Sequence, residues 1–181
     1  MSNSILRVKS SLKVTFLAFA LVFTASLSGC SNSNEAADAQ SKPTSVFFDS
    51  SQMSTELKKE IDSFEEPLPT NVKWFTETPS QLSQDKTTYE DGVAAGAVAF
   101  YWLCAWEESY LNAFDSGDSV QQDSSIKMIG KWDALPFYKA HYSDPDQAWR
   151  RTVLDPATLG DPTALRETFN NDCRELVIQH K

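Results

Sequence analysis

An uncharged apolar segment near the middle of the chain constrains the fold more than any other feature. Residues 92–106 contain no charged side chain. The segment is short for a bilayer-spanning helix, which needs about 20 apolar residues, and long for a surface helix. At helical spacing, apolar residues occupy two opposite faces: Val93, Ala97, Phe100, Cys104 and Leu111 on one, and Ala95, Ala99, Trp102, Trp106 and Tyr110 on the other. A helix that is apolar on both faces packs on two or more sides, so we expect it at the centre of a helical domain.

Both ends of this helix have signals in the sequence. Thr87 and Glu90 fit the capping box T-x-x-E, so the helix is expected to open there and to run to about Phe114. Gly92 and Gly96 form a GxxxG step near its start. In lipid such a step indicates helix dimerisation, whereas in a soluble domain it marks the close approach of another helix, which is the interpretation we favour.

Shorter apolar stripes predict the remaining helices. We expect them near residues 53–64, 120–134, 145–154 and 162–178, with a helical turn near 156–159. Asp144, Asp155 and Asp161 each precede a proline, and we expect each Asp to accept hydrogen bonds at a helix start. Residues 71–76 suit a brief extended segment without an evident partner strand. The sequence therefore predicts an all-α fold, a single small domain of about five helices over residues 45–181.

The chain opens with three distinct parts. Residues 1–13 carry three basic side chains and no acidic one, residues 14–27 are almost entirely apolar, and Ser28 and Gly29 lead to Cys30. A basic start, a short apolar core and a small-residue cleavage site are typical of an export signal. The apolar core is shorter than the roughly 20 residues of a membrane span.

This leader resembles that of bacterial lipoprotein precursors, whose lipobox is matched by Leu27, Ser28, Gly29 and Cys30. The resemblance implies that the Cys30 sulfur receives a diacylglyceryl group, that residues 1–29 are removed as a signal peptide, and that the new amino terminus receives a further acyl chain such as palmitate. Two or more acyl chains anchor stably where one is marginal. The expected location is the cell membrane or outer membrane, facing away from the cytoplasm. The alternative is an ordinary signal or uncleaved anchor in which the cysteine is incidental.

Residues 30–44 are predicted to form the lipidated cysteine and a flexible tether. After Cys30 this stretch is polar and has no aromatic or large aliphatic residue to bury. Removal of the leader takes the formal net charge from −9 to −12, because all three leader charges are basic. Such an acidic surface repels phosphate backbones, so a nucleic-acid partner is not expected. It suits a cation or a basic protein partner, and a merely solubilising surface is the simpler alternative.

Two cysteines remain once Cys30 is assigned to the anchor. Cys104 and Cys173 each lie on the apolar stripe of a predicted helix, so both are expected to face the core. In an exported protein a disulfide persists. A bridge between them closes a loop of about 69 residues and would stabilise the fold by roughly 4 kcal/mol in the chain-entropy model. The alternative is a pair of buried free thiols that pack as small apolar groups.

An aromatic stripe on the central helix is a candidate binding surface. If exposed, Trp102, Trp106 and Tyr110 can stack on sugar rings or hold a side chain of a partner. If buried, they belong to the core, and five Trp residues in a small domain favour burial. The indole N–H groups and the Tyr hydroxyl then need polar partners inside the domain.

Two acids near the end of the same helix are the other candidate binding residues. Glu108 lies one turn beyond Cys104, and a buried carboxylate there needs a cation, for which Arg166 is the nearest expected partner. Alternatively, Glu107 and Glu108 both reach solvent. No HExxH, GxSxG, P-loop or CxxC motif occurs, and the only histidines are His141 and His180. We therefore assign no catalytic residue, metal ligand or cofactor.

Three function classes follow from these observations. The one we favour is a lipid-anchored protein-interaction or accessory module of the cell envelope. The second is a lipoprotein that binds a small molecule, a glycan or a cation, which a pocket lined by Trp102, Trp106 or Trp149 with converging acids would support. The third is an envelope hydrolase that uses carboxylates of the central helix, which two carboxylates in catalytic geometry would support.

Overall fold

A computed structural model of the protein describes residues 47–174. The lipobox with Cys30, the tether, and the end of the predicted C-terminal helix after residue 174 lie outside the described residues. Within them the chain is mostly helical, which confirms an all-α domain of about five helices. Among these residues no helix is long and apolar enough to cross a membrane.

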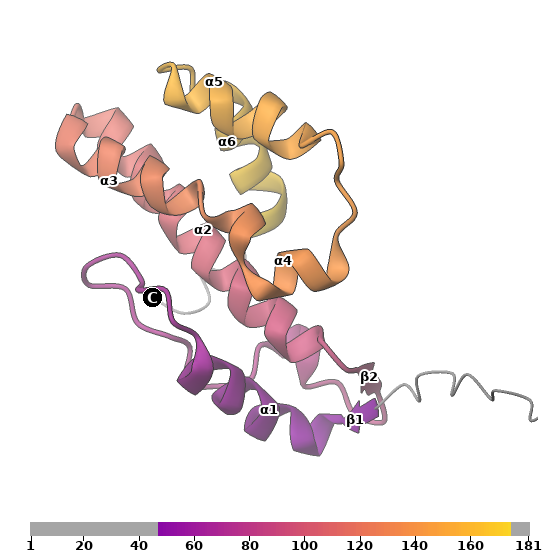
Figure 1. The fold of residues 1–181 in the computed structure, drawn as a ribbon. Helices are drawn as coiled ribbons and strands as arrows, with labels where there is room; N and C mark the ends of the chain where they lie inside the picture. Colours follow the sequence, from indigo (N-terminus) through magenta and orange to yellow (C-terminus); the bar gives the residue numbers. More distant parts are fainter. Residues whose placement is uncertain (1–46, 175–181) are drawn as a thin grey trace, which may run out of the picture. The chain divides into compact units, whose positions relative to one another are not determined.

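The described elements are mostly helices, with one small antiparallel sheet of two strands that lie far apart in the sequence (Figure 1). In chain order they are β1 (Phe47–Asp49), α1 (Ser50–Ser63), η1 (Ser80–Leu82), β2 (Thr88–Glu90), α2 (Val93–Ser116), α3 (Ser119–Ile129), η2 (Trp132–Ala134), α4 (Pro136–His141), η3 (Arg150–Leu154), α5 (Asp155–Thr158), α6 (Thr163–Thr168) and η4 (Phe169–Cys173). The η3 and η4 segments are π-helical turns, and η1 and η2 are 3-10 turns.

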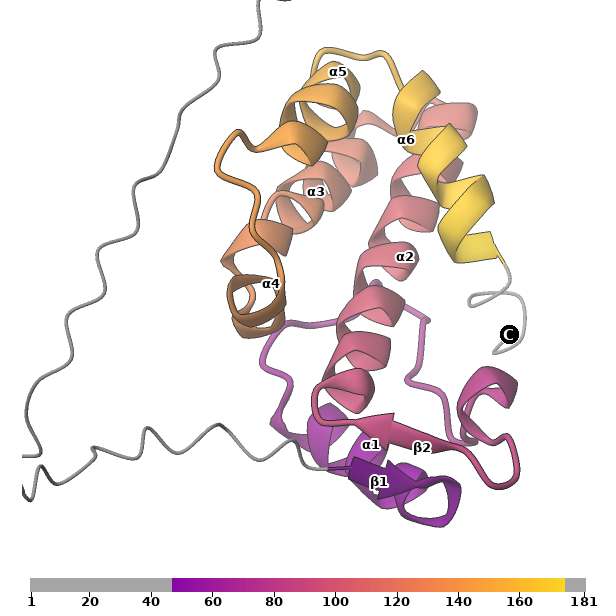
Figure 2. The same cartoon turned by 90° about the vertical axis from the view of Figure 1, so that its right-hand side faces the viewer.

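Helix α2 is the central element of the domain, as the two apolar faces predict. It packs against α1, α3, α4, α6 and η4 (Figures 1 and 2). Trp102, Val98, Ala99 and Cys104 are completely buried along it. Two apolar clusters meet on this helix, one shared with α1 and one shared with α3 and the C-terminal helices.

The predicted start of α2 is wrong. Thr88–Glu90 form strand β2, which pairs antiparallel with β1 at the register Phe48↔Tyr89. The helix begins at Val93, after Gly92 in a left-handed conformation with φ +93°. Pairing with a strand about 40 positions earlier holds this segment in an extended conformation, and a local capping pattern carries no information about that distant partner.

Helix α1 begins where the chain offers a full capping box. The Asp49 side chain accepts hydrogen bonds from the backbone N–H groups of Ser51 and Gln52, and the Gln52 side chain accepts from the Asp49 N–H at 3.1 Å. Met53 and Leu57 then turn into the core. Residues 71–76 form no strand, so the brief extended segment stays without a partner in the part of the chain that the structure describes.

The Asp-Pro pairs behave differently from one another. The carboxylate of Asp161 accepts from the Thr163 N–H at 3.0 Å, as expected at a helix start. The carboxylate of Asp144 accepts from the Ala148 N–H at 2.9 Å, but residues 145–147 form a turn, so the helix begins at Ala148 and not at residue 145 as predicted. Asp155 caps nothing, because η3 continues directly into α5. In η3 the Asp155 N–H bonds to the Arg150 carbonyl, five residues back, and the wider turn lets the helix continue into Pro156. The two predicted elements at 145–154 and 156–159 therefore merge.

A disulfide joins the central helix to the last described turn. The Cys104 and Cys173 sulfurs are bonded at 2.08 Å, with their Cα atoms 5.2 Å apart. Both residues are buried. This confirms the pairing expected from the sequence and fixes η4 against the middle of α2.

Candidate functional site

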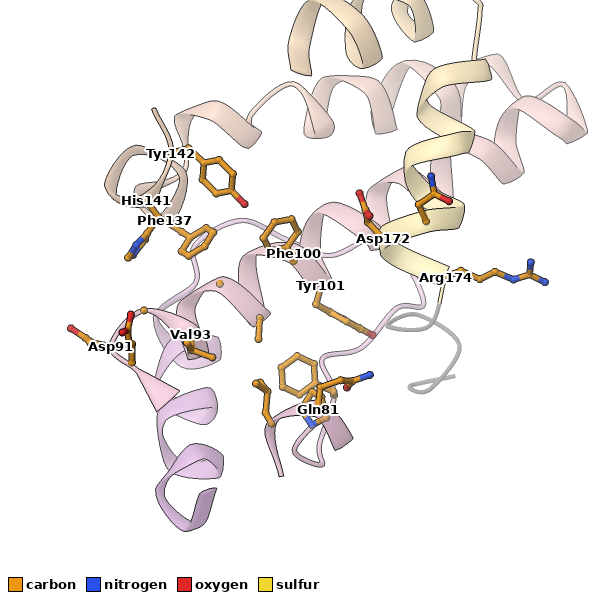
Figure 3. Close-up of a pocket in the computed structure, with 18 of the residues that line it drawn as sticks. Gln81, Asp91, Val93, Phe100, Tyr101, Phe137, His141, Tyr142, Asp172 and Arg174 are labelled. Atoms are coloured by element: carbon orange, nitrogen blue, oxygen red, sulfur yellow. The ribbon is translucent and has the colours of Figure 1, made fainter. Parts of the chain in front are cut away.

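A groove of about 1040 Å³ opens along the first half of α2. Its walls come from segments far apart in the sequence, namely η1, the end of β2, α4 and η4 (Figure 3). The residues labelled in Figure 3 are part of its lining: Gln81, Asp91, Val93, Phe100, Tyr101, Phe137, His141, Tyr142, Asp172 and Arg174. We call this feature the groove.

The two glycines at the start of α2 explain one wall of the groove. A Cβ atom on Gly96 would lie 3.0 Å from two ring carbons of Phe137, and one on Gly92 would lie 2.7 Å from Cε1 of His141. Only hydrogen atoms at these two positions allow α4 to come this close. The Gly92–Gly96 step is thus confirmed as the close approach of another helix.

The floor of the groove is an apolar stripe of α2. Val93, Ala97 and Phe100 lie on this stripe and are half-buried. Beside them Tyr101 is buried, and its hydroxyl donates to the Lys73 carbonyl oxygen at 2.7 Å. Burial and the nearby Glu108 carboxylate raise the pKa of Tyr101. The sequence predicts that this face of α2 packs against the domain, but its N-terminal end is accessible in the groove.

The charges around the groove are mostly negative. Glu90 is the last residue of strand β2, Asp91 follows it, and Asp172 comes from η4. Arg174 and the imidazole of His141 are the basic groups among the described lining residues. An apolar floor beside three carboxylates suits a ligand that combines apolar groups with positive charge.

A second cavity, of about 420 Å³, adjoins the groove. Phe100, Tyr142 and Asp172 line both. We call it the aromatic cavity, because five of its lining residues are Phe100, Trp132, Tyr138, Tyr142 and Trp149. Three acids, Glu107, Asp144 and Asp172, also line it, and the described lining residues include no Lys, Arg or His.

Glu107 is the most unusual residue of the aromatic cavity. Its side chain is completely buried, and its Oε1 has no hydrogen-bond partner among the described residues. Burial, followed by the nearby Asp172 carboxylate, raises its pKa to about 8. The group is therefore a neutral carboxylic acid near pH 7. Its Oε2 lies 3.3 Å from Cys173 Sγ, and since that sulfur is in a disulfide, the acid O–H donates to it.

The predicted aromatic stripe is part of the core. Trp102, Trp106 and Tyr110 are all buried, which is the second of the two interpretations. The indole N–H groups of both tryptophans donate to the Pro67 carbonyl oxygen at 2.9 Å. The Tyr110 hydroxyl donates to the Ala157 carbonyl oxygen at 2.7 Å. The polar ends therefore have the interior partners that burial requires, and the three rings present no surface for stacking.

The two acids occupy different environments. Glu107 faces inward, so the expectation that both acids reach solvent is wrong for it, while Glu108 is half-buried beside Ser109 and Asn112. Arg166 does not pair with Glu108. Its guanidinium donates to both carboxylate oxygens of Asp115, at 2.6 and 3.1 Å, because α6 crosses α2 closer to the C-terminal end of α2.

Comparison with known proteins assigns no family to this chain. No protein-family model, curated protein or solved structure matches this chain at a significant level. Within residues 47–174, no group of three or more His, Cys, Asp or Glu side chains is arranged to hold a metal ion.

Sequence reasoning missed the groove and most of the aromatic cavity. Their walls depend on α4 (Pro136–His141), for which the sequence predicted no helix. The signal that pointed to them was the Gly92–Gly96 step, which predicts a close neighbour without naming it. Trp149 with converging acids was anticipated only as a general condition for a ligand-binding protein.

Proposed function

We propose that this chain is a lipid-anchored lipoprotein of the cell envelope, whose helical domain binds a segment of another envelope protein in the groove. The lipobox Leu27–Cys30 supports the anchor. The groove carries the binding proposal, because an apolar floor bordered by Glu90, Asp91 and Asp172 is suited to an apolar side chain flanked by basic residues.

Site-specific cross-linking in cells tests this function. A photo-reactive amino acid at Ala97, in the floor of the groove, is compared with the same amino acid at Leu159, which is 87% exposed and not part of the groove. We expect a single cross-linked protein from position 97 and none from position 159. Replacing Cys30 with Ala should abolish the product, because the domain then loses its place at the membrane.

Two results would count against the proposal. Equal products from both positions would mean that the groove does not select the partner. An intact mass of the membrane-extracted wild-type protein that shows no lipid on Cys30 would remove the anchor.

A second candidate function is the binding of a small ligand. The observation that favours it is the aromatic cavity, in which Trp149 lies with three carboxyl groups. Cavities of several hundred Å³ lined by aromatic side chains and a few polar groups are typical of small-molecule sites.

A further inference from the structure

We propose that the aromatic cavity binds an organic ammonium cation, with ring faces contacting the cation and the carboxyl groups of Glu107, Asp144 and Asp172 supplying the opposing charge. This inference deepens the small-ligand candidate, and the cavity shares Phe100, Tyr142 and Asp172 with the groove. Three observations carry it, and each is argued in turn.

Four of the five aromatic rings in the cavity, those of Phe100, Trp132, Tyr138 and Tyr142, form one connected cluster. The centroid of Trp132 lies 5.1 Å from that of Phe100 and 5.6 Å from that of Tyr138. Tyr142 stacks on Tyr138 with a centroid separation of 4.9 Å. Electron-rich ring faces attract cations, and aromatic cages are a common means of recognising quaternary ammonium groups. Aromatic rings therefore make up a large part of the described lining of this cavity.

The charge of the cavity has one sign. Glu107 comes from α2, Asp144 from the segment after α4, and Asp172 from η4, so carboxyl groups reach it from three elements. The other titratable groups in its described lining are the Tyr138 and Tyr142 hydroxyls, and burial raises the pKa of both. No cationic side chain lies in the described lining, and Arg151 acts on Asp144 from outside it. A cation in the cavity is attracted by the three carboxyl groups, more weakly on the side where Asp172 and Tyr142 are exposed to solvent.

Binding of a cation in the cavity should ionise Glu107. The Oε1 atom of Glu107 is buried without a hydrogen-bond partner among the described residues, which lowers the stability of the fold. Glu107 also lines the aromatic cavity. A nearby positive charge favours its ionised form and so drives loss of its proton. The cation does not need to contact Glu107 directly, because two charges several Å apart still interact.

The aromatic cavity adjoins the groove along a shared wall. Figure 3 shows Phe100, Tyr142 and Asp172 in the lining of the groove, and the same three residues line the aromatic cavity. Tyr142 is 43% exposed, so this wall is in contact with solvent.

Isothermal titration with choline tests the proposal on the full domain at pH 8.5 and pH 6.5. The control ligand is 3,3-dimethyl-1-butanol, which has the same shape without the charge. We expect choline to bind at one site at least tenfold more tightly than the alcohol. Because ionised Glu107 strengthens binding, choline affinity should fall as the pH drops below about 8, by about tenfold in all between pH 8.5 and pH 6.5.

Two variants test whether choline binds in the cavity or is attracted only by the net charge of the protein. Glu107→Gln keeps the shape of the side chain and should remove the pH dependence and weaken choline at pH 8.5 about tenfold. Trp149→Leu should weaken choline at both pH values. Asp115→Asn changes the net charge equally at an exposed ion pair outside the cavity and should leave binding unchanged.

The outcomes distinguish this inference from the proposed function. Equal binding of choline and its neutral analogue, or no effect of either cavity variant in proteins with unaltered circular dichroism, would overturn the ammonium site. Neither result bears on cross-linking at Ala97, which reports on the groove alone. A partner cross-linked at the groove together with failure to bind choline would leave the interaction module in place without the cation site.

Discussion

The carboxyl Oε2 of Glu107 lies 3.3 Å from the sulfur of Cys173, inside the domain and next to the disulfide with Cys104. This contact brings the buried acid of α2 against the turn η4, which the disulfide fastens to the same helix. The protonation state of Glu107 and the disulfide between Cys104 and Cys173 therefore affect the same part of the core.

Stability should depend on pH through Glu107. Burial raises its pKa to about 8 in the folded state, from 4.5 when unfolded. The folded protein thus binds the extra proton between these values, so the free energy of unfolding is highest below the unfolded pKa and falls as pH rises towards 8. The full contribution between pH 5 and pH 8 is about 3 kcal/mol. Urea unfolding of wild type and Glu107→Gln at pH 5, 6, 7 and 8 measures the difference.

The neighbouring residue provides the control for this measurement. Glu108→Gln makes the same chemical change at a half-buried position and should keep the pH dependence of the wild type. If wild type and Glu107→Gln show parallel stability profiles, the carboxyl is ionised in both states and its burial has been misjudged.

Removal of the disulfide should destabilise the domain strongly. The bridge spans 69 positions of sequence. In the chain-entropy model a loop of that length contributes about 4 kcal/mol, a large fraction of the stability of a small domain. We expect a Cys104→Ala, Cys173→Ala double variant to unfold at much lower urea concentration. A non-reducing peptide map of the wild type that recovers both thiols free would contradict the bridge.

Gly92 should tolerate alanine less well than Gly117. Both have positive φ, +93° and +75°, so both substitutions strain the backbone by about 1 kcal/mol. A Cβ on Gly92 also meets the His141 ring, whereas one on Gly117 meets nothing within 4 Å. We therefore expect Gly92→Ala to cost about 1 kcal/mol more in thermal or urea unfolding. His141→Ala in the same chain should recover part of that excess, and strict additivity of the two changes would exclude the contact.

The ion pair of Arg166 should couple to Asp115 and not to Glu108. Both partners are partly exposed, so solvent screens the attraction, and the coupling energy should be about 0.5 kcal/mol. Double-mutant cycles with alanine measure it for each pair. A coupling of that size between Arg166 and Glu108, with none to Asp115, would show that α6 lies differently against α2 in solution.

The sequence by itself determined the helical class and the central helix, and it favoured a bridge between the cysteines over two free thiols. A stretch free of charge and apolar on both faces indicates a helix packed on several sides, and Cys104 and Cys173 each lie on an apolar stripe that is expected to turn inward. These features are local, because they follow from the spacing of residues along one helix.

Only the tertiary structure decided where α2 begins, which acid is buried, and where the cavities lie. Strand pairing with Phe47–Asp49 overrode the capping pattern at Thr87 and Glu90. The orientation of Glu107 towards Cys173 depends on where η4 crosses α2, and the groove depends on how closely α4 approaches two glycines. Each is set by contacts between residues distant in sequence, whose energies no local pattern records.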